Sequence, residues 1–345
     1  MKIKINNQIA FQNSNKPILI AEISGNHCGS KSRFLKHIIE AKKAGADMVK
    51  IQTYEENEIC INPKYLKKKN PMIKDVKKLF SIYKKYKTPF KWHKDAFKLA
   101  KKIKIELFST PFSIKAVDFL ETFNQKIYKI SSFEINDYQL VTKIASLRKP
   151  IIMSTGMSNL DEIKRCIKWI NKFHNKIIIL YCVSGYPTDE SELNLNSLDT
   201  LKKKFKRNLI GLSDHTNDIY SGFAASTKKI SAIEKHFVID DKKTADSSFS
   251  IKPHQFKKLS DGLKKMESIF GKKKLFLKPS EKKNIKFKRS VYAKRNIKRN
   301  HLIKNEDLIT FRPKIGICAS KIDKILDKRA KKNIKQFSPI YKSDI

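Results

Sequence analysis

The sequence predicts a parallel α/β barrel of the TIM type with an N-terminal hairpin, followed by a small C-terminal domain. Short runs rich in β-branched residues recur at even spacing through most of the chain. Each run is followed by polar or glycine-containing residues and then by an amphipathic pattern of helical period. Titratable side chains also gather where the runs end, and barrels of this type build their active sites at the carboxyl ends of their strands.

The runs expected to form the barrel strands share a short apolar centre and a polar exit. They number eight and cover residues 17–22, 47–52, 106–109, 127–131, 150–154, 177–182, 209–213 and 231–236. Amphipathic stretches such as 31–44, 95–102, 159–172 and 253–270 are expected to be helices that cover the barrel. The first ten residues alternate in polarity around Asn6-Asn7, which predicts a hairpin that plugs the lower mouth of the barrel.

Beyond the last helical pattern the composition turns strongly basic and loses its periodicity. We therefore predict a barrel domain over 1–268, a basic linker over 269–286 and a small domain over 287–345. The small domain is expected to hold two short strands, 290–293 and 307–311, and one short helix. Its size is near the lower limit for independent stability, so we expect it to dock against a larger surface.

The net charge of +42 raises the question of a nucleic-acid partner. Most of the positive charge is lysine, spread over the whole chain, and aromatic residues do not interleave with the lysine runs as stacking platforms would. We expect no nucleic-acid partner, and a basic field that attracts anionic substrates instead. No apolar run approaches the roughly 18 residues that span a bilayer, so no membrane partner is expected. The cysteine spacings predict reduced thiols in a cytoplasmic protein.

Two similar segments end in a histidine beside an acidic residue: Gly211-Leu212-Ser213-Asp214-His215 and Ile233-Glu234-Lys235-His236. Two imidazoles at neighbouring strand ends could hold a divalent cation and leave coordination positions for substrate and water. A single histidine in such a place is more often a core residue paired with a backbone group. The repetition of the pattern favours a metal site formed by His215 and His236.

The other strand ends carry carboxylates, lysines, hydroxyls and an amide. They are Glu22, Lys50, Gln52, Thr110, Lys129, Ser132, Ser154, Ser184, Tyr186, Ser213 and Glu234. Lysines that converge with hydroxyls on one mouth suit a phosphate together with a carboxylate, because lysine supplies charge and hydroxyls supply directional donors. A glycine-rich nucleotide loop is absent from the sequence.

These segments resemble the sialic acid synthase family, whose members condense phosphoenolpyruvate with an amino-sugar aldehyde. The resemblance extends from Pro17 to the end of the chain. It is carried in the barrel by Ile20-Ala21-Glu22, Lys50-Ile51-Gln52-Thr53, Phe108-Ser109-Thr110-Pro111-Phe112, Tyr128-Lys129-Ile130-Ser131-Ser132, Ser154-Thr155-Gly156-Met157, Tyr186-Pro187-Thr188 and the two histidine segments. In the tail, Arg289-Ser290-Val291-Tyr292-Ala293 and Phe311-Arg312-Pro313 resemble the antifreeze-like (SAF) domain of these enzymes.

The resemblance implies roles for these residues. His215 and His236 would hold Mn²⁺, with Mg²⁺ or Co²⁺ as alternatives, and Glu22 and Glu234 would position or deprotonate water. Phosphoenolpyruvate would be bound by Lys50, Lys129, Thr110, Ser132, Ser154, Ser184 and Ser213, with Gln52 as a further substrate-binding residue. Tyr186 and Asp246 would contact the sugar. Arg312 would reach the sugar from a partner subunit, which implies a homodimer that exchanges its C-terminal domains.

The segments 86–93, 132–134 and 246–250 resemble the pseudaminic acid synthase branch, whereas 108–112 is more similar to the sialic branch. We therefore expect the sugar to be 2,4-diacetamido-2,4,6-trideoxy-L-altrose. An N-acetylneuraminate or legionaminate synthase that uses an N-acetylmannosamine-type sugar is the first alternative. The second alternative belongs to another class, a non-catalytic basic module that binds nucleic acid.

Overall fold

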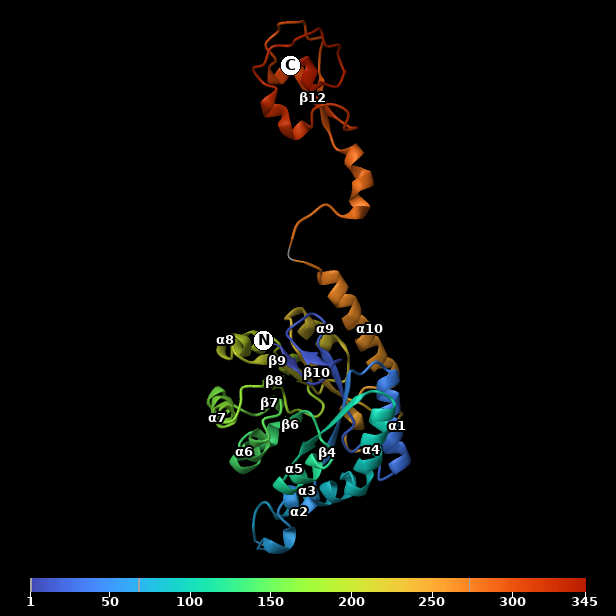
Figure 1. The fold of residues 1–345 in the computed structure, drawn as a ribbon, viewed down its shortest axis with the longest axis vertical. Coiled ribbons are helices and arrows are strands. Elements are labelled where there is room, and N and C mark those ends of the chain that lie inside the picture. The colour runs from blue at the N-terminus through green and yellow to red at the C-terminus, as the bar shows by residue number, and fades with distance from the viewer. Residues whose placement is uncertain (1, 68, 273) are drawn as a thin grey trace. The chain divides into compact units, whose positions relative to one another are not determined.

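The computed structural model describes residues 2–67, 69–272 and 274–345. These residues form two compact units, Met1–Gly271 and Lys272–Ile345 (Figure 1). The first unit contains a sheet of eight strands surrounded by helices, and the second contains a small two-stranded sheet.

The eight-stranded sheet has the order β5-β4-β3-β10-β9-β8-β7-β6, and its paired neighbours run parallel. The end strands β5 and β6 lie side by side, so the sheet closes on itself. This confirms the predicted TIM barrel. The strand bounds are β3 Ile18–Glu22, β4 Met48–Thr53, β5 Glu106–Pro111, β6 Tyr128–Ile130, β7 Ile151–Ser154, β8 Ile177–Cys182, β9 Leu209–Asp214 and β10 Ala232–His236.

Helices follow the strands and cover the outside of the barrel (Figure 1). They are α1 Lys31–Lys43, α4 Phe90–Lys102, α5 Ile114–Glu121, α6 Tyr138–Ser146, α7 Leu160–Asn171, α8 Ser197–Lys204, α9 Tyr220–Thr227 and α10 Pro253–Phe270. Helix α7 shows why these segments start where they do. The Asn159 side chain accepts hydrogen bonds from the Asp161 and Glu162 amides, and the Glu162 side chain accepts one from the Asn159 amide. These bonds satisfy the free amides at the start of the helix.

An additional segment between β4 and α4 holds α2 Glu56–Ile59, the short 3-10 turn Pro63–Tyr65 and α3 Ile73–Tyr86. Three further 3-10 turns, Ser132–Glu134, Glu190–Glu192 and Ser247–Phe249, lie in loops that follow strands. The βα loops belong to the C-terminal mouth, where this fold places its chemistry.

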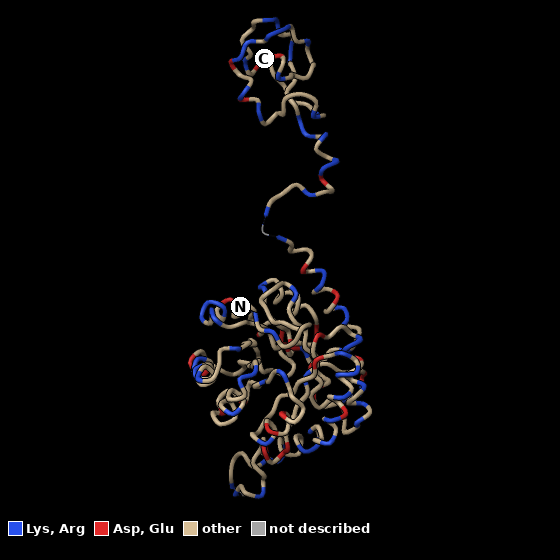
Figure 2. Tube along the Cα trace, viewed as in Figure 1, with Lys and Arg blue, Asp and Glu red and all other residues tan. Residues whose placement is uncertain are grey.

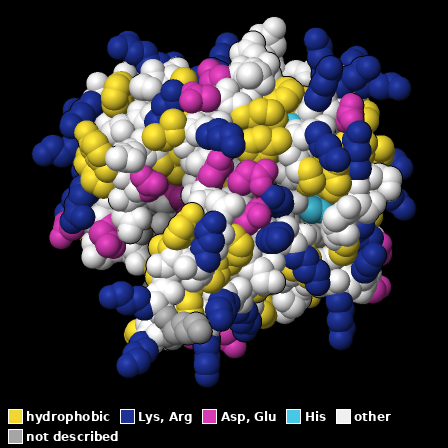
Figure 3. All heavy atoms as spheres, turned by 90° about the horizontal axis from the view of Figure 1, so that it is seen from below, with side chains coloured by type: hydrophobic (Ala, Val, Ile, Leu, Met, Phe, Trp, Pro, Cys, Tyr) yellow, Lys and Arg dark blue, Asp and Glu magenta, His cyan; other side chains and the backbone are white. Residues whose placement is uncertain are grey.

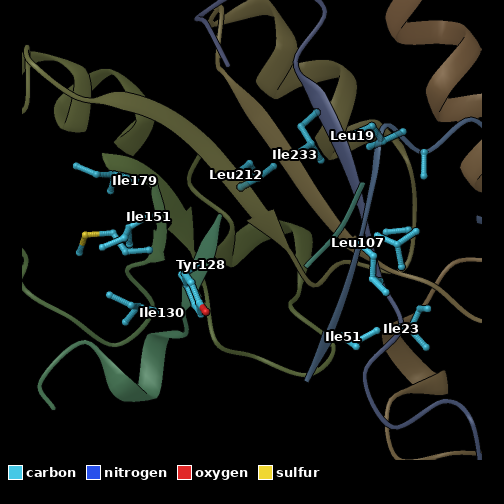
Figure 4. Close-up of a cluster of buried hydrophobic side chains, with 14 of the residues drawn as sticks. Leu19, Ile23, Ile51, Leu107, Tyr128, Ile130, Ile151, Ile179, Leu212 and Ile233 are labelled. Atoms are coloured by element: carbon cyan, nitrogen blue, oxygen red, sulfur yellow. The ribbon is translucent and has the colours of Figure 1, made fainter. Parts of the chain in front are cut away.

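Side chains that point outward from the strands form the larger buried cluster, between sheet and helices (Figure 4). Leu19, Ile51, Ile179 and Ile233 belong to this outer layer. The alternate residues of the strands point inward and form a second cluster, because successive side chains of a strand face opposite sides of the sheet. Its members from the strands include Ile20, Met48, Phe108, Ile152 and Ile178.

The predicted N-terminal hairpin is present as β1 Ile3–Lys4 and β2 Ala10–Phe11, paired antiparallel with Ile3 opposite Phe11. Ile3, Ile9 and Phe11 are buried in the inner cluster of the barrel. The hairpin therefore plugs the lower mouth, as expected, and its apolar side chains are part of the barrel core.

The second unit contains β11 Ser290–Ala293 and β12 Leu308–Phe311, which form the predicted pair of strands. Its core includes Val291, Ile303, Ile325 and Ile340. Instead of one short helix, this unit contains 3-10 stretches at Pro279–Phe287, Asn305–Asp307, Ala319–Lys324 and Lys342–Asp344. The first of these stretches lies in the segment that was expected to be an irregular linker. It forms there because Glu281 accepts a hydrogen bond from the Lys278 amide and so caps a turn that starts at Pro279.

Lysine and arginine residues occur along both units (Figure 2), and on the face shown in Figure 3 their side chains surround acidic and apolar side chains. Among the described residues, none of the helices is long and apolar enough to cross a membrane.

Three buried histidines make the barrel sensitive to acid. Burial lowers the pKa of His27, His37 and His93 to about 4, against about 6.5 in an unfolded chain. Between these values the unfolded chain binds more protons than the folded one, so stability falls as the pH drops from 6.5 toward 4. We expect the wild type to lose about 2 kcal/mol more than His93→Gln over that range.

Chemical denaturation at pH 6.5 and pH 4.5 measures this difference. His254, which is exposed, provides the matched control as His254→Gln. Equal losses in the wild type and His93→Gln would contradict the prediction.

Candidate active site at the C-terminal mouth

Four charged side chains from four strands meet at the floor of the C-terminal mouth. Lys50 Nζ lies 3.0 Å from Glu22 Oε2 and 3.0 Å from Glu234 Oε1. Lys129 Nζ lies 3.1 Å from the same Glu234 oxygen. The strand register brings Glu22 and Lys50 together, because these two residues are opposite each other on the β3–β4 pair. All four side chains are almost completely buried, so their charges are paired within the protein.

The two carboxylates have different surroundings and different proton affinities. Burial raises the pKa of Glu22 to about 7, with only partial opposition from Lys50. Burial also acts on Glu234, but its contacts with Lys129 and Lys50 hold the pKa of that carboxyl well below its usual range. Two carboxyl groups whose pKa values are pushed apart are the usual arrangement for separate acid-base and electrostatic roles.

Several buried polar atoms around this floor have no hydrogen-bond partner among the described residues: Thr110 Oγ1, Ser154 Oγ, Glu234 Oε2 and His236 Nδ1. Buried polar groups in folded proteins are almost always satisfied, so unmatched donors and acceptors in one place indicate a ligand site. Ser213 is partly satisfied, since its hydroxyl donates to Glu234 Oε1 over 3.3 Å.

The two predicted metal-binding histidines lie next to each other, with 5.3 Å between their ring centroids. His215 Nδ1 lies 2.9 Å from the Val183 carbonyl oxygen, which only accepts, so in the neutral form of the ring the lone pair is on Nε2. Burial lowers the pKa of His236 well below its usual value, which keeps that ring neutral and able to bind a cation.

These two imidazoles fit a divalent cation. Within the described ranges no group of three or more His, Cys, Asp or Glu residues is placed to share one ion. A cation held by these two rings alone would keep further coordination positions for water and substrate.

A buried ion pair lies directly behind the histidines. Asp214 and Lys235 precede His215 and His236 in the chain and are opposite each other on the β9–β10 pair. Lys235 Nζ donates to Asp214 Oδ2 over 2.8 Å and to the Thr216 carbonyl over 2.6 Å. Ser221 Oγ donates to the same Asp214 oxygen over 2.5 Å. This network ties together the ends of the two strands that carry the histidines.

A cavity of about 590 Å³ opens above the floor. The predicted residues that line it come from six strands or their following loops: Lys50, Gln52, Lys129, Ser132, Ser154, Tyr186, Ser213, His215, Glu234, His236 and Asp246. The structure thus brings most of the predicted site together.

Four predicted residues lie outside this lining. Glu22 and Thr110 are buried in the barrel wall below the cavity, next to Lys50 and Gln52 in the strand register. Ser184 Oγ lies 3.8 Å from Cys182 Sγ, and Cys182 is itself a lining residue. Arg312 belongs to the second unit, where it follows β12 and is exposed.

Several residues that line the cavity were not among the predicted site residues: Tyr54, Ile59, Leu79, Ile82, Tyr83, Phe112, Phe133, Glu134, Cys182 and Phe249. The sequence does contain a signal for helix α3, because the apolar residues at 73, 76, 80 and 83 follow a helical period. Glu134 is a titratable residue among them, and burial raises its pKa to about 7. Burial favours a higher pKa for the Cys182 thiol, but the contact with His215 acts in the opposite direction. The pKa of the thiol is lowered to about 7 as a result.

Comparison with known proteins agrees with this geometry. The NeuB family matches residues 37–275 and the SAF domain matches residues 288–345. A pseudaminic acid synthase of Campylobacter jejuni is 37% identical over 340 residues, which cover 97% of this chain and 98% of that protein. An N,N'-diacetyllegionaminic acid synthase of the same species is 35% identical over 329 residues, 93% of this chain and 98% of that protein.

Among solved structures, the N-acetylneuraminic acid synthetase of Leptospira borgpetersenii is similar, with a TM-score of 0.73 and 28% identity. The match covers 83% of this chain and 95% of that one. The predicted family resemblance is thus confirmed over both parts of the sequence. The chain belongs to the NeuB family and is a nonulosonic acid synthase whose C-terminal unit is a SAF domain.

Proposed function

We propose that this enzyme is a pseudaminic acid synthase, a transferase that condenses phosphoenolpyruvate with 2,4-diacetamido-2,4,6-trideoxy-L-altrose. The observation that carries the proposal is the pair of buried lysines that share Glu234 beneath a cavity with unmatched hydroxyls. Pseudaminic acid synthases at 33–38% identity over almost the whole chain support the choice of sugar.

Phosphoenolpyruvate carries a phosphate and a carboxylate, and the floor supplies matching groups. Lys50 and Lys129 provide positive charge that is out of contact with water. The residues that add directional donors around them are Gln52, Thr110, Ser132, Ser154, Ser184 and Ser213. Because burial has already removed water from the ammonium groups of Lys50 and Lys129, an approaching anion costs little further desolvation of these groups.

The reaction joins carbon 3 of phosphoenolpyruvate to the aldehyde carbon of the open-chain sugar, while the aldehyde oxygen takes up a proton and becomes a hydroxyl group. Positive character then develops at carbon 2, where the ionised Glu234 stabilises it. Water adds at carbon 2 and gives its proton to Glu22, whose pKa of about 7 suits a base near neutrality. The resulting tetrahedral centre loses inorganic phosphate by cleavage of the C–O bond, which yields the keto acid.

His215 and His236 would hold a divalent cation, Mn²⁺ in the first place and Mg²⁺ or Co²⁺ as alternatives, that polarises the aldehyde oxygen as a Lewis acid. Tyr186 and Asp246 would contact the sugar. The Tyr186 ring lies 4.4 Å from the His215 ring, so a sugar held by Tyr186 has its aldehyde near the two imidazoles. The five free cysteines support a reducing, cytoplasmic setting.

Phosphate release with phosphoenolpyruvate, Mn²⁺ and a panel of sugars tests this proposal. We expect turnover with 2,4-diacetamido-2,4,6-trideoxy-L-altrose and much less with N-acetylmannosamine or the legionaminic precursor. A preference for either of those sugars would favour the sibling activity, which the 35% identical legionaminic relative keeps open. Salt-sensitive DNA binding without any phosphate release would favour the nucleic-acid alternative.

Gly156 offers a prediction about the hydroxyls of the site. A Cβ atom at this position would meet Ser184 Oγ at 2.0 Å and Ser132 Oγ at 2.9 Å. Gly156→Ala should displace both hydroxyls while the barrel stays folded, because side-chain ends move more easily than backbone. We expect kcat/KM for phosphoenolpyruvate to fall about tenfold to hundredfold, with a change in the unfolding midpoint of only a few degrees. Phosphate-release kinetics and thermal unfolding measure both, and wild-type kinetics would contradict the prediction.

The proposal extends to the assembly. We propose a homodimer that exchanges its SAF domains, so that Arg312 of one copy binds the sugar in the barrel of the other. The family resemblance of Phe311-Arg312-Pro313 supports this, as does the exposure of Arg312 within its own unit.

Arg312→Ala is expected to raise the KM for the sugar at least tenfold and to leave the KM for phosphoenolpyruvate unchanged, since only the sugar would lose a charged partner. The exposed Arg299, changed to alanine, is the matched control in the same unit. An unchanged KM for the sugar would argue against the exchange.

A further inference from the structure

Helix α3 presents an apolar face to the cavity of the active site. Leu79, Ile82, Tyr83 and Tyr86 of this helix line the same cavity as Lys50 and Lys129. Leu79 is 42% exposed and Ile82 is 37% exposed. The lysines of α3, such as Lys78 and Lys84, are exposed and are not lining residues.

The apolar face continues beyond α3. Ile59, Phe112 and Phe133 belong to the same lining, and Phe133 is 59% exposed. The Tyr54 ring connects the elements, since its centroid lies 5.6 Å from that of Tyr83 and 5.5 Å from that of Phe112. We name Ile59, Leu79, Ile82, Tyr83, Phe112 and Phe133 the apolar wall.

The cavity is therefore divided by chemistry and by depth. Its two lysines and Glu234 are buried at the floor, whereas Leu79, Ile82 and Phe133 of the apolar wall are exposed to water. An apolar surface that remains in contact with water is unfavourable unless a ligand covers it, and ligand sites commonly combine such a surface with a few polar groups.

The orientation of the sugar follows from this division and rests on the proposed function. The aldehyde is carbon 1 and must react at the floor. In an open chain, carbon 6 is the carbon farthest from the aldehyde, so it extends away from the floor toward the more exposed part of the cavity. The proposed sugar has a methyl group at carbon 6, and this is the kind of group that an apolar wall binds.

We propose that the apolar wall, through Leu79 and Ile82 of α3, selects sugars with a methyl group at carbon 6 over sugars with a hydroxymethyl group. A hydroxyl at this position would lose water without gaining a partner from Leu79 or Ile82. Discrimination by such a surface is moderate, about tenfold to hundredfold in kcat/KM.

The test uses matched sugars that differ only at carbon 6: the 2,4-diacetamido-2,4,6-trideoxy sugar and its 6-hydroxy counterpart. We expect the wild type to prefer the deoxy sugar by about tenfold to hundredfold. In Leu79→Ser/Ile82→Ser the preference should shrink about tenfold, mainly through a higher KM for the deoxy sugar, while the KM for phosphoenolpyruvate stays the same. Lys84→Ser, on the opposite side of α3 from Leu79 and Ile82, is the matched control and should keep the preference.

Each of the other possible outcomes would contradict either the inference or the proposed function. Turnover of both sugars with the same preference in the wild type and the double variant would overturn the inference. So would a double variant that changes only the oligomeric state in sedimentation, because the apolar wall would then be covered by a second copy of the chain.

If neither diacetamido sugar reacts and N-acetylmannosamine does, the proposed function fails. The same variants are then compared on N-acetylmannosamine and its 6-deoxy form, where the inference predicts the same loss of preference. Since Leu79 and Ile82 are exposed, the serine variants should fold, and their unfolding midpoint confirms it.

Discussion

Lys50→Met is expected to lower kcat/KM for phosphoenolpyruvate by about a thousandfold or more. The ammonium group of Lys50 bridges Glu22 and Glu234 at 3.0 Å from each. Its removal deprives the substrate anion of a charged partner and leaves two buried carboxylates with less compensation. Breaking a buried ion pair in this way costs about 3–5 kcal/mol of stability, so the variant should also unfold at lower denaturant concentration. Single-turnover phosphate release and equilibrium denaturation measure the two effects.

The matched control for this variant is Lys94→Met, on the exposed side of α4. It removes the same charge from a protein whose net charge is +42, so it separates a local effect from a change in the overall basic field. Loss of activity in both variants would assign the effect to the field, and activity in Lys50→Met would remove Lys50 from the site.

His236→Ala is expected to weaken Mn²⁺ binding by at least about a hundredfold and to reduce turnover in proportion to the metal lost. In the proposed metal site the two imidazoles are the protein ligands, so this substitution would remove one of the two. Substitution of a residue that only hydrogen-bonds to a metal ligand lowers the metal affinity about tenfold to hundredfold. Loss of the ligand itself should lower the metal affinity further. Titration of Mn²⁺ followed by electron paramagnetic resonance gives the affinity without reference to turnover.

The exposed His254, changed to alanine, serves as control for His236→Ala. A variant with normal Mn²⁺ affinity and no activity would mean that His236 acts on the substrate instead. The pair Asp214–Lys235 provides a graded comparison, because it supports both histidine strands from behind without touching the cavity.

Much of the fold could be predicted because local and global signals agree. Runs such as Ile177-Ile178-Ile179-Leu180 favour strands by their β-branched side chains, and their even spacing leaves few topologies other than a barrel. Once the barrel is inferred, residues at strand ends must converge. The sequence therefore predicted that Lys50, Lys129, Glu234 and His236 lie at one mouth of the barrel, although it gives no distances between them.

What could not be predicted depends on contacts between distant segments. Glu22 and Glu234 are equivalent strand-end carboxylates in the sequence, and only the geometry shows that Glu234 contacts two lysines while Glu22 contacts one. The difference in their pKa values follows from that count. Helix α3 escaped prediction as a site element because its place in the long β4–α4 segment does not reveal which face meets the cavity.

The pairing of β3 with β10 has a consequence for synthesis of the chain. The first barrel strand lacks its last neighbour until Ala232–His236 has been translated. The cluster that contains Ile3 and Phe11 is likewise incomplete until Leu209 and Ala232 have been translated. A nascent chain on the ribosome thus exposes an unpaired strand edge and apolar side chains until late in translation, a state prone to aggregation. Barrel closure across so long a sequence separation should also make refolding slow.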